Sequence, residues 1–235
     1  MVRKWPLIAA GLVALAGSGA FLAAQSTESG NDAAPSQDAA ERDVAASAEA
    51  MAARAAIADD PIAPKLAPEG YDVTIISYAD YQCPYCRKIH TELERLAEED
   101  GKVRIVYRDW PIFGSASEEA ARAAIASQWQ GKHAAFNDAL MKVQGRLDSE
   151  KIRAAADRAG VDWGQLQRDM ETRNSDIGAV IGRTSRQAAQ MGLQGTPALL
   201  IGPYMVPGAI DYAGLTKGVE LAREFNAQNV GADGR

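Results

Sequence analysis

Cys83 and Cys86 are the only cysteines of this 235-residue chain, and Pro84 and Tyr85 separate them. Such a pair can be a redox couple, part of a metal site, or two inert core residues. A structural disulfide across so short a loop would constrain the unfolded chain little, because this kind of stabilisation grows with loop length. We therefore expect the two thiols to be reactive groups rather than a structural disulfide.

The elements on either side of the pair indicate which chemistry that is. Residues 72–78 are β-branched and aromatic, which predicts a buried strand, and residues 83–99 carry apolar side chains at helical spacing. Cys83 would stand at the helix N-terminus, where unpaired N–H groups and the helix dipole favour a thiolate. Pro84 suits the first helical turn, where its missing N–H is not needed. We predict Cys83 as the attacking thiol and Cys86 as the less exposed thiol that resolves a mixed disulfide.

The rest of the chain predicts an interrupted α/β fold. Residues 103–108 form a second strand, which completes a β-α-β unit with parallel strands. From residue 113 to 192 the sequence has no convincing strand, but it has start signals for several short helices at Ser117, Asp148 or Ser149, Asp162 and about Asp176. Two strands around Gly202-Pro203 and a closing helix follow. We expect residues 71–112 and 193–228 to form one α/β domain, with residues 113–192 as a helical insertion.

The N-terminal third predicts export and a linker. Residues 1–24 join two basic residues to a long apolar run, which is typical of a signal peptide or a membrane anchor. Either function places the rest of the chain outside the cytoplasm. Residues 25–70 are expected to form a flexible tether that contains an alanine-rich helix at about 38–59. Its small side chains would bury little area, so we expect a monomer, with oligomerisation through residues 38–59 as the alternative.

The net charge and the two histidines bear on two other functions, nucleic-acid binding and metal binding. A formal net charge of −6 and a pI of about 5.1 argue against nucleic acid as a partner. His90 follows Cys86 by four residues, so Cys83, Cys86 and His90 could together bind copper or zinc. The other histidine, His133, lies in the predicted insertion. Two thiolates alone can hold Cu(I), so copper handling stays the alternative of another class. We expect no resident metal, and no cofactor beyond a redox-active Cys83–Cys86 disulfide.

Two further stretches are candidates for a substrate-binding surface. Gly195-Thr196-Pro197 stands just before a predicted strand, where the proline could simply start that strand. A cis bond there would instead turn the backbone of Thr196 toward a bound chain. Trp110, Pro111 and Phe113 could line a substrate groove, but we expect them to pack at the junction between the second strand and the insertion. Tyr85 is expected at the exposed rim of the thiol pair.

These motifs together resemble the DsbA-like branch of the thioredoxin superfamily. The resemblance rests on Asp80-Tyr-Gln-Cys-Pro-Tyr-Cys86, Tyr107-Arg-Asp-Trp-Pro-Ile-Phe113 and Gly195-Thr-Pro197, and covers about residues 71–225. It implies a thioredoxin fold and thiol–disulfide exchange with exported, cysteine-containing proteins in the periplasm or another extracytoplasmic space. A membrane redox partner is expected as well. The implied site consists of Cys83, Cys86, Thr196 and a cis Pro197, with Pro84, Tyr85 and Asp80 as modulating residues.

The chain also departs from this family. Many relatives place a buried acid six residues before the first cysteine, where this chain has Ser77. The dipeptide between the cysteines is Pro-Tyr, whereas strong oxidants usually have Pro-His, and Thr196 is more frequent in isomerase-like and reductase-like relatives. We expect oxidation of exported proteins, with isomerase or reductase activity at the same site as the alternative.

Overall fold

The computed structural model describes residues 37–230, and side chains from residue 48 to 229. The predicted signal or anchor, residues 1–24, lies outside these residues. The chain divides into two units, and the boundary between them falls within the first helix, between Arg42 and Asp43. The unit that begins at Asp43 contains the sheet and all later helices. In chain order the elements are α1 (Gln37–Ala58), β1 (Lys65–Leu66), β2 (Val73–Ala79), α2 (Pro84–Asp100), β3 (Val103–Asp109), α3 (Ser115–Ser127), a 3₁₀ turn (Gln128–Gln130), α4 (His133–Met141), α5 (Ser149–Arg158), α6 (Trp163–Thr172), α7 (Asn174–Gln190), β4 (Ala198–Ile201), β5 (Tyr204–Pro207) and α8 (Tyr212–Val230).

The strands form one sheet in the order β1-β3-β2-β4-β5. The central strand, β2, is parallel to β3, with Ser77 opposite Tyr107, and α2 connects the two. β4 is antiparallel to β2, with Tyr78 opposite Ala198, and β5 forms a hairpin with β4. The predicted β-α-β unit and the predicted hairpin are therefore both present. Together with the helices between them, they make the thioredoxin fold with a helical insertion that the sequence indicated.

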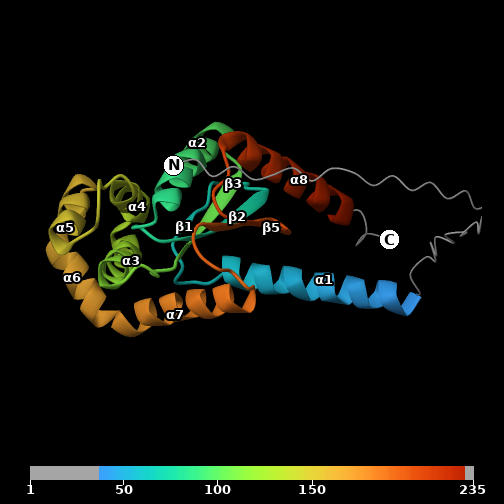
Figure 1. Cartoon of the computed structure of the whole chain (residues 1–235), viewed down its shortest axis with the longest axis horizontal. Coiled ribbons are helices and arrows are strands. Elements are labelled where there is room, and N and C mark those ends of the chain that lie inside the picture. Colours follow the sequence, from blue (N-terminus) through green and yellow to red (C-terminus); the bar gives the residue numbers. More distant parts are fainter. Residues whose placement is uncertain (1–36, 231–235) are drawn as a thin grey trace, which may run out of the picture. The chain divides into compact units, whose positions relative to one another are not determined.

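Each face of the sheet has its own apolar core, because alternate strand residues point to opposite faces. Ile75, Ile105 and Leu199 pack with apolar residues of α2 and α8. On the other face, Ile76 and Val106 join a cluster that continues into the helices of the insertion. α2 and α8 lie over one face of the sheet, and α7 lies against the other (Figure 1). The carboxyl ends of β2 and β3 thus meet α2 and the insertion at one place.

The helices of the insertion pack through small side chains, and two of them have a side-chain cap at the N-terminus. Ala120 and Ala124 of α3 are fully buried, which allows neighbouring helices to approach closely. Asp148 accepts a hydrogen bond from the backbone N–H of Lys151, and Asp162 caps α6 in the same way. Both caps agree with the helix starts predicted there. α3 and α7 each begin two residues earlier than their predicted starts, at Ser115 and Asn174.

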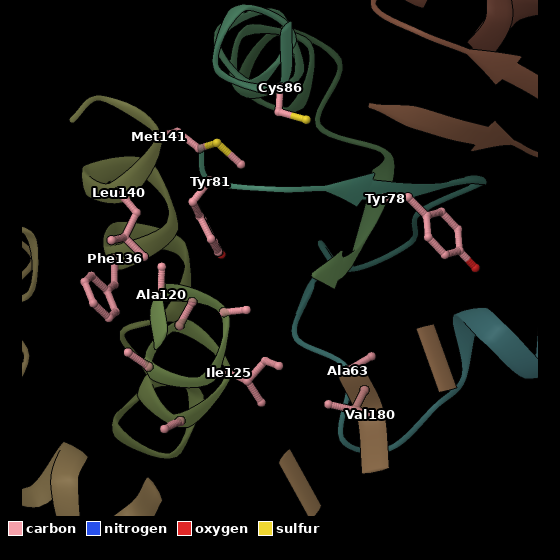
Figure 2. Packing of buried hydrophobic residues seen from close by; sticks show 14 of the residues in the cluster. Ala63, Tyr78, Tyr81, Cys86, Ala120, Ile125, Phe136, Leu140, Met141 and Val180 are labelled. Carbon is pink, nitrogen blue, oxygen red and sulfur yellow. The ribbon is translucent and has the colours of Figure 1, made fainter. Parts of the chain in front are cut away.

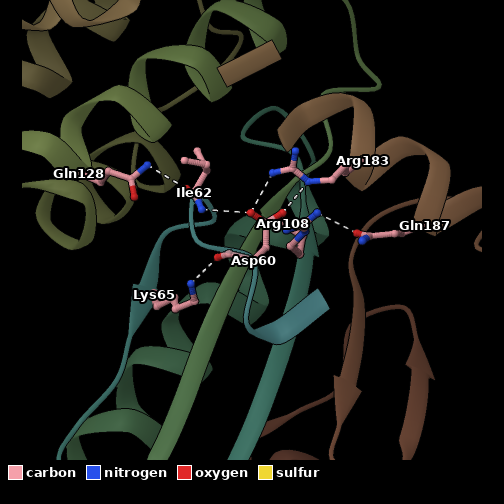
Figure 3. Close-up of polar contacts among 7 residues, drawn as sticks. All are labelled: Asp60, Ile62, Lys65, Arg108, Gln128, Arg183 and Gln187. Atoms are coloured by element: carbon pink, nitrogen blue, oxygen red, sulfur yellow. Dashed lines mark hydrogen bonds and ion pairs between the residues drawn. The ribbon is translucent and has the colours of Figure 1, made fainter. Parts of the chain in front are cut away.

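The segment between α1 and β2 corrects one sequence prediction. It was assigned to the flexible tether, but Lys65 and Leu66 pair antiparallel with β3 as an edge strand. Two residues carry no readable periodicity, so the sequence could not reveal this strand. The preceding Asp60 is 5% exposed and binds Arg108 of β3 at 2.9 Å and Arg183 of α7 at 2.8 Å (Figure 3). Residues 60–66 therefore belong to the folded domain.

The ion cluster around Asp60 fixes this segment electrostatically. Burial alone would raise the pKa of the Asp60 carboxyl, but hydrogen bonds from Arg183 and Arg108 outweigh it and hold the pKa well below its ordinary range. Arg108 also donates to the Gln187 side chain of α7 at 2.7 Å. The cluster thereby ties the end of α1 to both the sheet and the insertion. Removing one partner would leave a buried charge without compensation.

Candidate active site

The thiol pair opens α2, as the sequence predicted. Cys83 caps the helix in an extended conformation (φ −73°, ψ 119°), and Pro84 occupies the first turn. The carbonyl of Cys83 accepts the backbone N–H of Arg87 at 3.1 Å, so it already belongs to the helical ladder. Its own N–H donates to the carbonyl of Asp80 at 3.1 Å. The Cys83 side chain therefore lies where the unpaired N–H groups of the helix converge.

Exposure does not separate the two cysteines. Cys83 is 2% exposed and Cys86 is 1% exposed, and both are free thiols in the structure. Cys86 is the less exposed thiol, as predicted, but by a margin too small to distinguish the roles of the two residues. The exposed rim is formed by Tyr85, at 65%, as expected. Figure 2 shows the Cys86 side chain at the edge of the larger apolar cluster, which also contains Tyr81 and Met141.

Acidity does separate the two thiols. A hydrogen bond from Cys86, aided by the Thr196 hydroxyl and by backbone N–H groups of Cys86 and Tyr85, lowers the pKa of Cys83 to about 5 against the opposing effect of burial. The same hydrogen bond to the Cys83 sulfur, together with burial, raises the pKa of Cys86 far above its ordinary value. At neutral pH Cys83 is a thiolate and Cys86 remains protonated. The helix N-terminus contributes the backbone donors, but the neighbouring thiol has the larger effect.

The Gly195-Thr196-Pro197 stretch lies directly against the thiols. The Thr196–Pro197 peptide bond is cis. In the thiol form, Sγ of Cys83 donates to the carbonyl oxygen of Thr196 at 3.2 Å. The Thr196 hydroxyl is buried and has no hydrogen-bond partner among the described residues. It is thus available as a donor when Cys83 loses its proton.

Asp80 holds two loops together beside the thiols. Its carboxylate, which is 1% exposed, accepts hydrogen bonds from the backbone N–H of Gln82 at 2.7 Å and the Ser117 hydroxyl at 2.7 Å. It also accepts the backbone N–H groups of Ile112 at 2.7 Å and Phe113 at 3.1 Å. Through these hydrogen bonds Asp80 fixes the loop after β3 relative to the thiol pair.

The anchored loop presents apolar side chains to solvent. Ile112 is 42% exposed and Phe113 is 49% exposed. The expectation that Phe113 packs inside is therefore wrong, because the Asp80 contacts hold its backbone at the surface. Trp110 does pack as expected, edge-on to Tyr78 with ring centroids 6.5 Å apart. Tyr85, Ile112 and Phe113 together provide exposed apolar surface near the thiols.

Sequence reasoning missed two residues near the site. Arg87 donates to the carbonyl oxygens of Tyr81 and Gly145, both at 2.9 Å, and so ties the first turn of α2 to the loop after α4. Asp109 ends β3 and is 4% exposed, and burial raises its pKa to about 7. Asp109 is the one acidic residue of β3, and this was the available signal for it in the sequence. No pattern in the sequence pointed to Arg87.

His90 does not join the cysteines. Its Nε2 lies 3.3 Å from Asp138 and 3.4 Å from Glu94. Between residues 37 and 230, the one group of three or more potential metal ligands is His90, Glu94 and Asp138. A Cys83-Cys86-His90 site is therefore not formed in this structure. His133 is buried against Tyr107, with ring centroids 4.8 Å apart, and burial lowers its pKa to about 3, so it is neutral.

Comparisons with known proteins agree with this geometry. Residues 69–220 match the family model described as Thioredoxin. A crystal structure of a thioredoxin-like oxidoreductase from Silicibacter pomeroyi DSS-3 is 40% identical, covers 73% of this chain and 98% of its own, and superposes with a TM-score of 0.69. The thiol-disulfide exchange protein alpha-DsbA2 from Wolbachia pipientis is 27% identical over 78% and 98% of the two chains, with a TM-score of 0.69. A periplasmic thioredoxin-like protein from Salmonella enterica serovar Typhimurium is also 27% identical, over 73% and 95% of the chains, with a TM-score of 0.65.

The chain also matches part of a much longer protein. It is 26% identical to Na(+)/H(+) antiporter NhaA 1 from Mycolicibacterium gilvum, and the match covers 64% of this chain but 25% of that protein. In the described part of the chain, no helix has both the length and the apolar character needed to cross a membrane. The family model, the structural neighbours and the arrangement of Cys83, Cys86 and cis Pro197 agree with one another. We conclude that the chain belongs to the thioredoxin superfamily and is a DsbA-like member of it.

Proposed function

We propose that the protein is an extracytoplasmic thiol–disulfide oxidoreductase that exchanges disulfides with exported proteins. The observation that carries this proposal is the opposite acidity of two adjacent thiols, with the pKa of Cys83 lowered to about 5 and that of Cys86 raised. This division provides one stable thiolate and one protonated partner within reach of it. The name of the Wolbachia relative, a thiol-disulfide exchange protein, supports the same activity.

The exchange proceeds in two balanced steps. A substrate thiolate attacks Sγ of Cys83 in the oxidised protein, forms the mixed disulfide and releases the Cys86 sulfur, which takes up a proton. A second substrate thiolate then attacks the substrate sulfur of the mixed disulfide and releases Cys83 as a thiolate. Two electrons pass from the substrate dithiol to the protein, and the substrate gains a disulfide. A thiol of low pKa is a good leaving group, so the second step favours substrate oxidation.

The surroundings of Cys83 supply a place for the substrate chain. Thr196 lies against the sulfur, and Tyr85, Ile112 and Phe113 offer exposed apolar surface near it. An unfolded polypeptide exposes apolar side chains next to its cysteines, so such a surface would hold it while the sulfurs exchange. We assign Cys83 as the nucleophile, Cys86 as the resolving thiol and Thr196-Pro197 as the substrate-facing loop. Pro84, Tyr85 and Asp80 modulate or position them.

Stabilisation of the reduced form favours an oxidant. A thiolate that is stable at neutral pH lowers the free energy of the dithiol state relative to the disulfide, which raises the reduction potential. Catalysis then needs a membrane redox partner that removes the two electrons. The periplasmic relative from Salmonella supports an extracytoplasmic location, as does the signal-like segment at residues 1–24.

Three assays on the purified protein test the direction of the reaction. We expect the oxidised protein to restore disulfides in a reduced, unfolded ribonuclease, to reduce insulin poorly, and to have a reduction potential well above that of thioredoxin, which is about −270 mV. Cys83→Ser is the inactive control. Fast insulin reduction, or recovery of scrambled ribonuclease by the reduced protein, would assign the chain as a reductase or an isomerase instead.

A further inference from the structure

A second cluster of reactive side chains lies on the helix that carries the thiols. His90 and Glu94 stand four residues apart on α2, so their side chains share one face of that helix. Asp138 of α4 faces them. One ligand atom from each of these three residues lies within 4.8 Å of the other two. The cluster thus joins the thiol-bearing helix to the insertion, and the proposed exchange reaction does not use it.

The distances from His90 to the two carboxylates match those between neighbouring ligand atoms of a coordination sphere. Nε2 of His90 is 3.4 Å from Oε1 of Glu94 and 3.3 Å from Oδ1 of Asp138. Two ligand atoms of a tetrahedral zinc ion, bound at about 2.0–2.1 Å, lie roughly 3.3 Å from each other. One imidazole nitrogen with two carboxylate oxygens is also a donor set that zinc accepts. Glu94 and Asp138 have side chains that are 34% and 27% exposed, which leaves room for water as a further ligand.

A cation already occupies the carboxylates of this cluster. Nζ of Lys142 lies 2.5 Å from Oδ1 of Asp138 and 3.7 Å from Oε2 of Glu94. The His90 side chain is 7% exposed, whereas that of Lys142 is 61% exposed. A lysine ammonium on a flexible stem can move into solvent without disturbing the helix. Lys142 therefore shows that the carboxylates attract a cation, and it is also the group that an incoming metal ion must displace.

We propose that His90, Glu94 and Asp138 form a site for a divalent first-row transition ion of the zinc class, which binds by displacing the ammonium group of Lys142. The bound ion would cross-link α2 to α4. It would stabilise the contact between the thiol-bearing helix and the insertion, because binding to the folded state alone adds to its stability. The site is separate from Cys83 and Cys86, so its failure would leave the proposed exchange reaction untouched.

Zinc titration of the oxidised full-length protein tests this site. The Cys83–Cys86 disulfide removes the thiolates as competing ligands, and a chromophoric chelator reports the free metal. We expect one zinc ion to bind per chain. Glu94→Gln and Asp138→Asn should each weaken binding at least tenfold, which corresponds to about 1.4 kcal/mol. Glu98→Gln, an exposed position on the same helix, removes the same charge and should keep the parent affinity.

Lys142→Met supplies the opposite change. It removes the competing ammonium group but keeps an unbranched side chain, so zinc should bind more tightly than to the parent protein. Zinc should also raise the thermal midpoint of the oxidised parent and not that of Glu94→Gln. A thermal midpoint is measured only on folded protein, so a variant that fails to fold cannot be mistaken for one that fails to bind zinc. The proposal is overturned if the oxidised protein binds no zinc, if Glu94→Gln and Asp138→Asn bind as tightly as Glu98→Gln, or if Lys142→Met gains no affinity.

Discussion

Sγ of Cys83 and the carbonyl oxygen of Thr196 are 3.2 Å apart, although 113 residues separate them in the chain. The contact exists because β4, which follows Thr196 closely, pairs with β2, which precedes Cys83. The pairing of Tyr78 with Ala198 sets the register that brings the two loops together. The helical insertion between them leaves the sheet in one piece. The site is thus assembled by strand pairing, and its chemistry depends on how these loops adjust one sulfur.

The pH dependence of alkylation should report the acidity of Cys83. We expect its rate of reaction with iodoacetamide to be constant above about pH 6 and to fall below pH 5, because the pKa of Cys83 is lowered to about 5. In Cys86→Ala the strongest cause of this shift is lost, so the pKa should rise by ~1 unit or more. Mass spectrometry of the labelled peptide measures both profiles. A parent rate that still increases between pH 8 and pH 9 would contradict the assignment.

Loss of the Asp80 carboxylate should destabilise the fold near the site. Its four hydrogen bonds anchor the loops that contain Gln82 and Phe113, and a buried donor left without a partner costs about 1–3 kcal/mol. We expect Asp80→Ala to lower the free energy of unfolding by about 3 kcal/mol and Ser117→Ala, which removes one donor, by about 1 kcal/mol. Urea unfolding of the oxidised proteins provides the comparison. Equal effects of the two changes would show that Asp80 is not the anchor.

Stability should depend on pH through Asp109. Burial raises the pKa of its carboxyl to about 7, above the unfolded value, so the folded state holds the extra proton. This contribution is complete below about pH 4 and is lost as the pH rises through 7, at about 1.4 kcal/mol per unit. Asp109→Asn keeps the neutral shape, so its stability relative to the parent should increase by about 2 kcal/mol between pH 5 and pH 8.

Chemical denaturation of the oxidised proteins across this pH range measures the effect of Asp109→Asn. Oxidation matters here because the cysteines then do not titrate. Asp176→Asn, at an exposed position of α7, is the matched control and should show no such trend. If both variants follow the parent protein at every pH, the Asp109 carboxyl is ionised without penalty in the folded state.

The expectation of a monomer rests on the small exposed side chains of α1. Ala48 and Ala55 are exposed, and their small side chains would bury little area in an oligomer. We therefore expect a fragment that begins at Asp38 to be a monomer by multi-angle light scattering. A dimer or trimer that disappears when residues 38–59 are deleted would reverse this expectation. It would also favour isomerase activity, because assembly can shield reduced thiols from oxidation.

The strands and the thiol-bearing helix could be predicted because their signals are local. The β-branched run before Asp80 and the apolar spacing after Cys83 each extend over several residues, and the structure places β2 and α2 there. The helix caps Asp148 and Asp162 were readable for the same reason. The resemblance to a known family then indicated the cis bond at Pro197, which spacing alone could not.

What the sequence did not reveal depends on contacts between distant residues. Lys65 and Leu66 become a strand through pairing with β3, and Asp60 is fixed by an arginine 123 residues away. Phe113 is exposed because the Asp80 carboxylate holds its backbone, which composition does not indicate. The acidity of Cys83 depends mostly on the position of the Cys86 sulfur. Such effects follow from the packed structure rather than from any short stretch of sequence.

Trapping of a mixed disulfide tests the central claim most directly. Cys86→Ala retains the nucleophile and lacks the resolving thiol, so it should accumulate a covalent adduct with a cysteine-containing unfolded protein supplied as its activated disulfide. Mass spectrometry should place that adduct on Cys83, and a reducing agent should release it. Cys83→Ala, which retains Cys86, should form little adduct, because the Cys86 thiol is 1% exposed and its burial still raises its pKa after the effect of the Cys83 sulfur is lost. Adduct formation on Cys86 that equals or exceeds that on Cys83 would contradict the assignment of the two thiols.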